Sequence, residues 1–158
     1  MRVRPFDATR DSYDALTLLL HSAYRRLADM GLNYVATTQD ASVTRTRVAA
    51  ADACWVAEDD GAIVGTVCYY AGLRHDREPA WYARAAVCHF GPFAVLPSLQ
   101  GGGVGTSLLR AVEERALADG KTELACDTAE PASHLLEYYA RRGFRVVGRH
   151  RWPHAVYD

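Results

Sequence analysis

The sequence lacks any long hydrophobic segment. No apolar run approaches the roughly 18–20 residues that cross a lipid bilayer, and Met1 to Pro5 lack the apolar core of a secretory signal. These absences predict a cytoplasmic protein without a membrane partner. Internal repeats, low-complexity tracts and linkers are missing too. We therefore expect residues 1–158 to form a single domain of ordinary globular composition, 49% hydrophobic and 23% charged.

An excess of either charge sign is also missing. The formal net charge is −1 at pH 7, whereas a general nucleic-acid binder is usually clearly basic. Five arginines between residues 141 and 151 are the local exception, and we interpret them as a solvated face or an anion site. We predict no nucleic-acid partner. The oligomeric state stays open, with a homodimer as one option.

Cysteines at metal-binding or redox spacing are absent as well. The chain has four cysteines and no C-x-x-C pattern, and each lies in an apolar, strand-like segment: Cys54, Cys68, Cys88 and Cys126. Isolated cysteines in such segments are typical of buried, reduced thiols. We therefore predict neither a metal site nor a disulfide.

What the sequence does contain is a regular succession of short strands and helices. Strands are predicted over residues 3–6, 54–57, 63–69, 87–96, 124–126 and 145–148, and the last residues are a candidate seventh strand. Helices are predicted after the capping residues 7–12, from about 40 to 50, from the glycines near 103 to about 120, and over 133–142. This order predicts an α+β fold with a mixed central β-sheet. The sheet is antiparallel in its N-terminal half and β-α-β-α-β in its C-terminal half, with helices on both faces.

The most informative segment is the glycine-dense turn from Gln100 to Gly105, which joins a predicted strand to a predicted helix. Backbone N–H groups and the helix dipole converge there, so the turn suits a phosphate. A P-loop would need a Lys-Ser/Thr pair after its last glycine, and Thr106-Ser107 stands there instead. The dinucleotide spacing Gly-x-Gly-x-x-Gly fails too, because its last position is Thr106 or Leu108.

The spacing that does fit is Gln-x-x-Gly-x-Gly, carried by Gln100, Gly103 and Gly105. It resembles the acyl-coenzyme A motif of the GCN5-related N-acetyltransferases. A second signature, Tyr139-Ala-Arg-Arg-Gly143-Phe144, is similar to the Tyr-x-x-x-Gly-Phe element of the same family. The resemblance covers almost the whole chain and is sharpest from about residue 87 to 148. It implies the acyl-CoA N-acyltransferase fold and transfer of an acetyl group from acetyl-CoA to a primary amine of a small molecule or protein.

The resemblance also implies which residues bind the coenzyme. The main chain of Phe93 and Val95 would pair with the pantetheine arm like an added strand, and the amides from Gly101 to Thr106 would wrap the pyrophosphate. The expected coenzyme-binding residues are Phe93, Ala94, Val95, Gln100, Gly101, Gly102, Gly103, Val104, Gly105, Thr106 and Tyr139. One position departs from the family: Ala132 stands where many members carry an asparagine. The arginines near the C-terminus are candidates for the 3′-phosphate.

The same resemblance implies the catalytic roles. Attack of the amine on the thioester forms a tetrahedral intermediate, whose oxyanion a main-chain N–H near Phe93 would hold. Tyr139 would be the general acid for the departing thiolate. A thiol pKa of about 8.5 against about 10 for tyrosine makes that proton transfer uphill by roughly 2 kcal/mol, which is workable.

The general base and the acceptor are less well defined by the sequence. His89 is the histidine close to the expected reaction centre, and its ordinary pKa suits a base; Glu58 is the alternative. The acceptor loop offers Asn33, Tyr34, Thr37 and Gln39. Aromatic residues could line the pocket or pack in the core: Tyr69, Tyr70, Trp81, Tyr82 and Trp152. The alternative function is a non-catalytic acyl-CoA-binding or sensor domain of the same fold.

Overall fold

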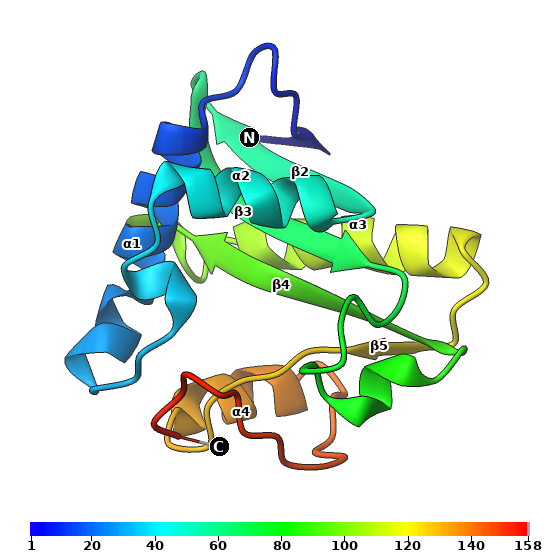
Figure 1. The fold of residues 1–158 in the computed structure, drawn as a ribbon. Coiled ribbons are helices and arrows are strands. Elements are labelled where there is room, and N and C mark those ends of the chain that lie inside the picture. Colours follow the sequence, from blue (N-terminus) through cyan, green and yellow to red (C-terminus); the bar gives the residue numbers. More distant parts are fainter. Residues whose placement is uncertain (158) are drawn as a thin grey trace.

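The structure is a computed structural model that describes residues 1–157, and its centre is a five-stranded sheet (Figure 1). The strands lie in chain order and are β1 (Arg2–Pro5), β2 (Ala53–Asp59), β3 (Ala62–Tyr70), β4 (Val87–Val95) and β5 (Glu123–Ala125). The first three pairings are antiparallel, and β5 runs parallel to β4. The fold class predicted from the sequence is confirmed.

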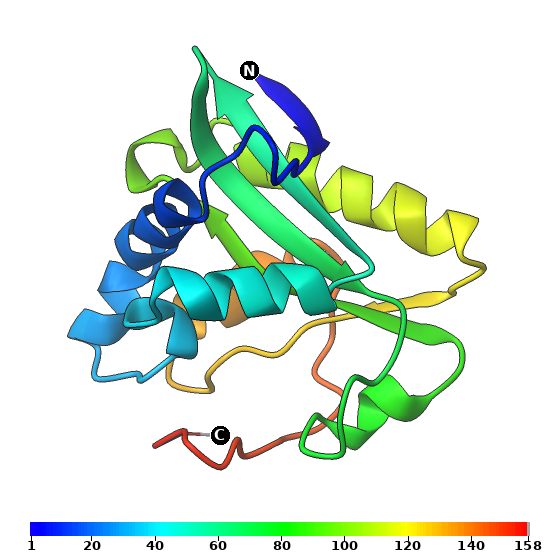
Figure 2. The ribbon, with the colours of Figure 1, turned by 45° about the horizontal axis from the view of Figure 1, so that its top comes forward.

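Helices α1 (Tyr13–Asp29) and α2 (Ala41–Ala50) cover one face of the sheet (Figures 1 and 2). Their first residues follow capping side chains, because Ser12 accepts from the amide of Ala15 and Asp40 accepts from the amides at the start of α2. Leucines of α1 face the sheet and are almost fully buried: Leu16, Leu19 and Leu20. Each such side chain stabilises the fold by about 1.5–3 kcal/mol.

Helix α3 (Val104–Ala118) covers the opposite face, and α4 (Ser133–Ala140) adds its aromatic residues to the same core. Leu108 and Val112 of α3 are fully buried against β3 and β4. The approach is close: a Cβ built on Gly65 of β3 would lie 2.9 Å from Leu108 Cδ1. Sheet positions beneath α3 therefore tolerate little added volume.

Strands β4 and β5 pair only at one end, and this opening positions the site. The ladder joins Val87 to Glu123 and continues as far as His89 opposite Ala125. On the other side of β4, two residues, Gly91 and Pro92, lie opposite Cys68 of β3 and form a bulge. Beyond the bulge, the edge of β4 that faces away from β3 is not covered by β5 (Figure 1).

The predicted sixth and seventh strands are not formed. Residues 144–157 are irregular in the structure, so the last strand of the predicted β-α-β-α-β half is wrong. Val146 and Val147 are 75% and 40% exposed, and β5 has only three residues to offer as a partner. A three-residue partner offers few ladder hydrogen bonds, so the apolar composition of residues 145–148 is not enough by itself to form a strand. Within residues 1–157, no helix has both the length and the apolar content to span a membrane.

Candidate active site

The glycine-dense turn between β4 and α3 has the backbone shape that phosphate binding needs. Gly101 and Gly103 adopt left-handed conformations, with φ of 82° and 87°, which side chains rarely adopt. Gly103 is the N-cap of α3 and makes no side-chain capping bond. The amides of the first turn therefore point outward at the positive end of the helix dipole.

The exposed edge of β4 carries the main-chain groups of Phe93 and Val95. Leu96 donates its amide to Val64 across the β3 pairing, and alternation along an antiparallel pair then turns the N–H and C=O of Phe93 and Val95 away from β3. Side chains already reach this edge. Tyr24 Oη donates to the Phe93 carbonyl at 3.3 Å, and Gln100 Nε2 donates to the Val95 carbonyl at 3.2 Å.

The side chains of two predicted coenzyme residues, Ala94 and Val104, are buried in the core. Ala94 is 3% exposed and packs with the α1 leucines, with its main chain on the β3 side of the strand. The side chain of Val104 is buried beneath α3, so only its amide is directed toward the turn. Ala132, at the position where the resemblance noted an asparagine in many members, is fully buried as well. Helix α4 therefore starts without a polar capping side chain.

Helix α4 closes the glycine turn from the other side through Tyr138. Its hydroxyl oxygen lies 3.1 Å from where a Cβ on Gly105 would be, and Phe93 Cζ lies equally close. A larger residue at position 105 would therefore crowd Phe93 and Tyr138, so packing as well as the predicted coenzyme binding favours glycine there. The Arg142 guanidinium lies 3.6 Å from the Tyr138 ring centroid, and its Nη2 reaches Thr106 Oγ1 at 3.5 Å. The position of Tyr138 at the turn was not predicted from the sequence, whereas Arg142 is one of the arginines predicted as candidates for the 3′-phosphate.

Tyr139 lies in an aromatic environment between the sheet and α4. Its ring centroid is 5.4 Å from that of Phe144 and 6.1 Å from that of Phe90. Burial raises its pKa well above the ordinary value, and the nearby Cys126, Tyr24 and Tyr34 raise it further. The hydroxyl of Tyr139 is thus held in its protonated form.

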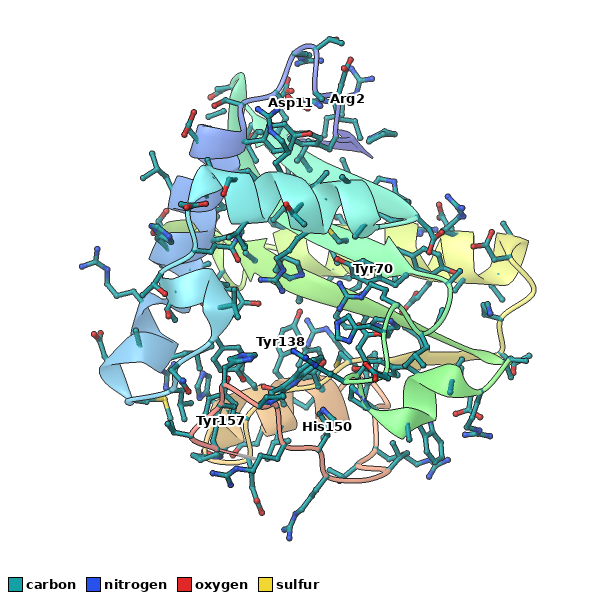
Figure 3. All side chains as sticks on the ribbon, viewed as in Figure 1. Arg2, Asp11, Tyr70, Tyr138, His150 and Tyr157 are labelled. Carbon is teal, nitrogen blue, oxygen red and sulfur yellow. The ribbon has the colours of Figure 1, made fainter. Side chains whose placement is uncertain are left out.

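On the α1 side of the opening, three further tyrosine rings pack in a row, Tyr24 edge-on against Tyr34 and Tyr34 tilted against Tyr157. The Tyr34 ring lies 5.5 Å from Tyr24 and 5.2 Å from Tyr157 of the C-terminal segment. Tyr34 accepts from the amide of Ala129 at 2.6 Å, and its hydroxyl lies 3.2 Å from that of Thr128. Figure 3 shows Tyr138 and Tyr157 beside α4 and the C-terminal segment, whereas Tyr70 lies on the side of α2. The aromatic side chains therefore surround the β4 edge from both sides.

The two predicted base candidates are both in hydrogen-bonded networks. The His89 ring stacks between Tyr82, at 3.9 Å, and Tyr70, at 5.0 Å, and its Nε2 lies 3.1 Å from the Gly72 carbonyl oxygen. Burial lowers the pKa of His89, although the carboxylate of Glu78 opposes this. Glu58 lies on β2, away from the opening, and accepts hydrogen bonds from Arg4 and Arg10. His89 lies at the start of the opening, in the last pair of β4 with β5, and Glu58 does not.

A hollow of about 670 Å³ lies beside the C-terminal segment and the loop before β4, and is lined by His75, Asp76, Arg77, Trp152, Pro153 and His154. Trp152 connects it to the opening, because its indole N–H donates to Asp127 Oδ2 at 3.0 Å. Three of the four cysteines are buried, and Cys126 is partly buried. Over residues 1–157, no three His, Cys, Asp or Glu side chains are grouped to hold a metal ion.

The glycine-capped helix beside an open β4 edge is the arrangement that the sequence motif predicted. The family model of the acetyltransferase (GNAT) family matches residues 17–144. The chain belongs to this family. It is therefore an acyltransferase, and the family predicted from the two motifs is confirmed.

Curated relatives and solved structures agree with this membership. The chain is 31% identical over 137 residues to S-(2-succino)cysteine N-acetyltransferase of Bacillus subtilis (strain 168), covering 85% of this chain and 79% of that protein. It is 27% identical over 142 residues to S-alkylcysteine N-acetyltransferase of the same organism, covering 88% and 76%. A GNAT acetyltransferase from Brucella melitensis, solved in complex with acetyl-CoA, shares the fold with a TM-score of 0.61 and 21% identity over 99% and 93% of the chains.

Three residues near the opening were not predicted from the sequence: Tyr24, Arg47 and Asp127. Tyr24 reads as one apolar position of an amphipathic helix, Arg47 as a solvent-facing helical residue and Asp127 as a loop residue after a strand. No local motif marks them, since they meet only when α1, α2 and the segment after β5 converge. Tyr34 and Gln39 of the predicted acceptor loop do reach this region.

Proposed function

We propose that this GNAT protein transfers the acetyl group of acetyl-CoA to the primary amine of a small molecule of the S-substituted cysteine type. The observation that supports acetyl-CoA as the acetyl donor is the glycine-capped start of α3 beside the uncovered edge of β4. The named substrates of the two Bacillus relatives support the acceptor type. Acetyl-CoA is a co-substrate in this scheme, and no step requires a metal ion.

The residues at the opening suit direct transfer. The neutral amine attacks the thioester carbonyl carbon, and the Phe93 N–H, which faces the same edge, would hold the oxyanion of the tetrahedral intermediate. As the C–S bond breaks, the thiolate takes the hydroxyl proton of Tyr139. The nitrogen loses one proton to a base or to solvent, and the tyrosinate of Tyr139 takes one proton back, so the neutral amine and acetyl-CoA give the amide and the free thiol with no net release of a proton. For the base, His89 stays the prediction made from the sequence.

Release of the CoA thiol, followed with a thiol-reactive dye across a panel of amines, tests the proposal. We expect release that depends on an S-substituted cysteine such as S-methylcysteine. Acetyl-CoA at a hundredfold excess over its dissociation constant should also stabilise the fold by about 2.7 kcal/mol, whereas NAD and ATP should not.

Two results would contradict the proposal in different ways. Equal thermal shifts with acetyl-CoA, NAD and ATP would remove the donor assignment. Tight acetyl-CoA binding without thiol release on any amine would favour the alternative, a non-catalytic acyl-CoA sensor of the same fold.

A further inference from the structure

Arg47 of α2 is a half-buried cation without a carboxylate partner. Its Nη1 donates to Gln39 Oε1 at 2.7 Å, and within the part of the chain that the structure describes no carboxylate oxygen lies within 4.0 Å of it. Gln39 is itself buried and fixed, because its Nε2 donates to Thr44 Oγ1 at 2.7 Å. A guanidinium has five N–H donors, so this one is positioned by a neutral amide and can still bind an anion.

Asp127, which follows β5, is the opposite case. Its Oδ1 accepts from the Tyr82 hydroxyl at 2.9 Å and its Oδ2 from the Trp152 indole at 3.0 Å. Both donors are neutral, and among residues 1–157 no cationic nitrogen lies within 4.0 Å of this carboxylate. Two ionised oxygens have about four lone-pair sites. The side chain is therefore oriented and can still accept from an ammonium group.

Chains of contacts connect both charged groups to Tyr24 of α1. His21 lies one turn before Tyr24 on the same face of α1, and its Nε2 is 2.7 Å from the carbonyl oxygen of Gln39, which also holds Arg47.

On the other side of Tyr24, its ring packs on that of Tyr34, and the hydroxyl of Tyr34 touches Thr128, the residue after Asp127. Tyr24 in turn donates to the Phe93 carbonyl at the β4 edge, where the acetyl group is expected.

The electrostatic environment of Tyr24 agrees with this placement. Burial raises its pKa to about 12, and among the smaller effects the positive charge of Arg47 lowers the value while the negative charge of Asp127 raises it. Both charged groups are therefore close enough to act on the hydroxyl that marks the reaction centre.

We propose that Arg47 binds a carboxylate of the acceptor and Asp127 binds its amine, so the acceptor is an amino acid rather than a simple amine. This inference rests on the proposed function and names the residues that would bind the two charged groups of its acceptor. A polycationic acceptor would place positive charge against the unpaired guanidinium, whereas an acceptor with both charges pairs each group. Hydrogen bonds to charged groups contribute about 1.5–3 kcal/mol, which is roughly a 10- to 100-fold change in affinity.

Steady-state kinetics on S-methylcysteine and its neutral carboxamide test the carboxylate contact. We expect the wild-type kcat/KM to be roughly 10- to 100-fold higher for the acid. Arg47→Gln should raise KM for the acid by this factor and leave KM for the carboxamide unchanged. Arg45→Gln is the matched control, because Arg45 is an exposed arginine on the same helix that lies over the Tyr13 ring; both substrates should react as with the wild type. Asp127→Asn should raise KM for both substrates.

The failure of this inference differs from the failure of the proposed function. Equal wild-type kcat/KM for the acid and the carboxamide, or equal losses on both in Arg47→Gln, would overturn the carboxylate contact while acetyl transfer stands. Unchanged KM values in Asp127→Asn would overturn the amine contact. No thiol release with any amine would overturn the proposed function, and this inference with it.

Discussion

At the scale of single residues, the environment of Tyr139 decides how it can act. Its raised pKa keeps the hydroxyl protonated beyond pH 10, so the acid form is present over the whole physiological range. A higher pKa also makes the proton harder to give. The same burial disfavours a thiolate placed beside it, so the thiolate is driven to accept the proton.

We therefore expect Tyr139→Phe to lower kcat by roughly 10²–10⁴ and to leave KM for acetyl-CoA nearly unchanged, because the ring remains to pack on Phe90 and Phe144. Any alkaline loss of wild-type activity that reports this acid should fall above pH 10. Tyr138→Phe is the comparison: it removes a hydroxyl beside Gly105, so it should change KM for acetyl-CoA rather than kcat. Wild-type turnover in Tyr139→Phe would mean that water protonates the thiolate.

At the scale of the elements, helix α3 allows a matched test of the glycine turn. Gly103 at its start and Gly120 just after its end both adopt left-handed conformations, and a Cβ on either would meet nothing within 4 Å. Valine at either position should cost a similar 1–2 kcal/mol or more of backbone strain. Only Gly103→Val should abolish stabilisation by acetyl-CoA in a thermal-shift titration. Equal acetyl-CoA affinity in the two variants would show that the turn is merely structural.

The same elements show what the sequence can predict. Every strand from β1 to β5 and all four α-helices were predicted near their observed bounds, because local periodicity, caps and glycines define them. The sixth strand failed because pairing is non-local: residues 145–148 have a strand-like composition, but Val146 stays 75% exposed. Arg47 and Asp127 were missed for a related reason, since nothing in their neighbourhoods records the contact with Gln39 or Trp152.

At the scale of the whole molecule, the opening between β4 and β5 separates the proposed coenzyme site from the proposed acceptor site. The glycine turn, α3 and the Tyr138 face of α4 form the proposed coenzyme side. Helices α1 and α2 and the segment after β5 form the proposed acceptor side, and Asn33 ties the C-terminal segment to it by donating to the His154 carbonyl at 2.6 Å. On this proposal, acceptor specificity can change through α1, α2 and the C-terminal segment while the donor side keeps its motifs.

The pH dependence of global stability tests the packing around His89, which stacks between Tyr70 and Tyr82. Burial lowers the folded-state pKa of His89 below its ordinary value of about 6.5, so the unfolded chain binds a proton more readily. Stability that is present above about pH 6.5 is therefore lost as the pH falls toward the folded-state pKa. The carboxylates with lowered pKa values, including Asp11 and Glu58, lose their contribution to stability only at lower pH.

His89→Phe keeps a ring between Tyr70 and Tyr82 but cannot be protonated. Urea unfolding at intervals from pH 5 to 8 should show the wild-type free energy of unfolding falling below about pH 6.5. The variant should show a shallower fall, because His134, whose pKa burial also lowers, remains. At pH 8 the variant should be less stable by about 1 kcal/mol, since the hydrogen bond to Gly72 is lost. Identical pH slopes in the two proteins would mean that His89 can be protonated without disturbing this stack.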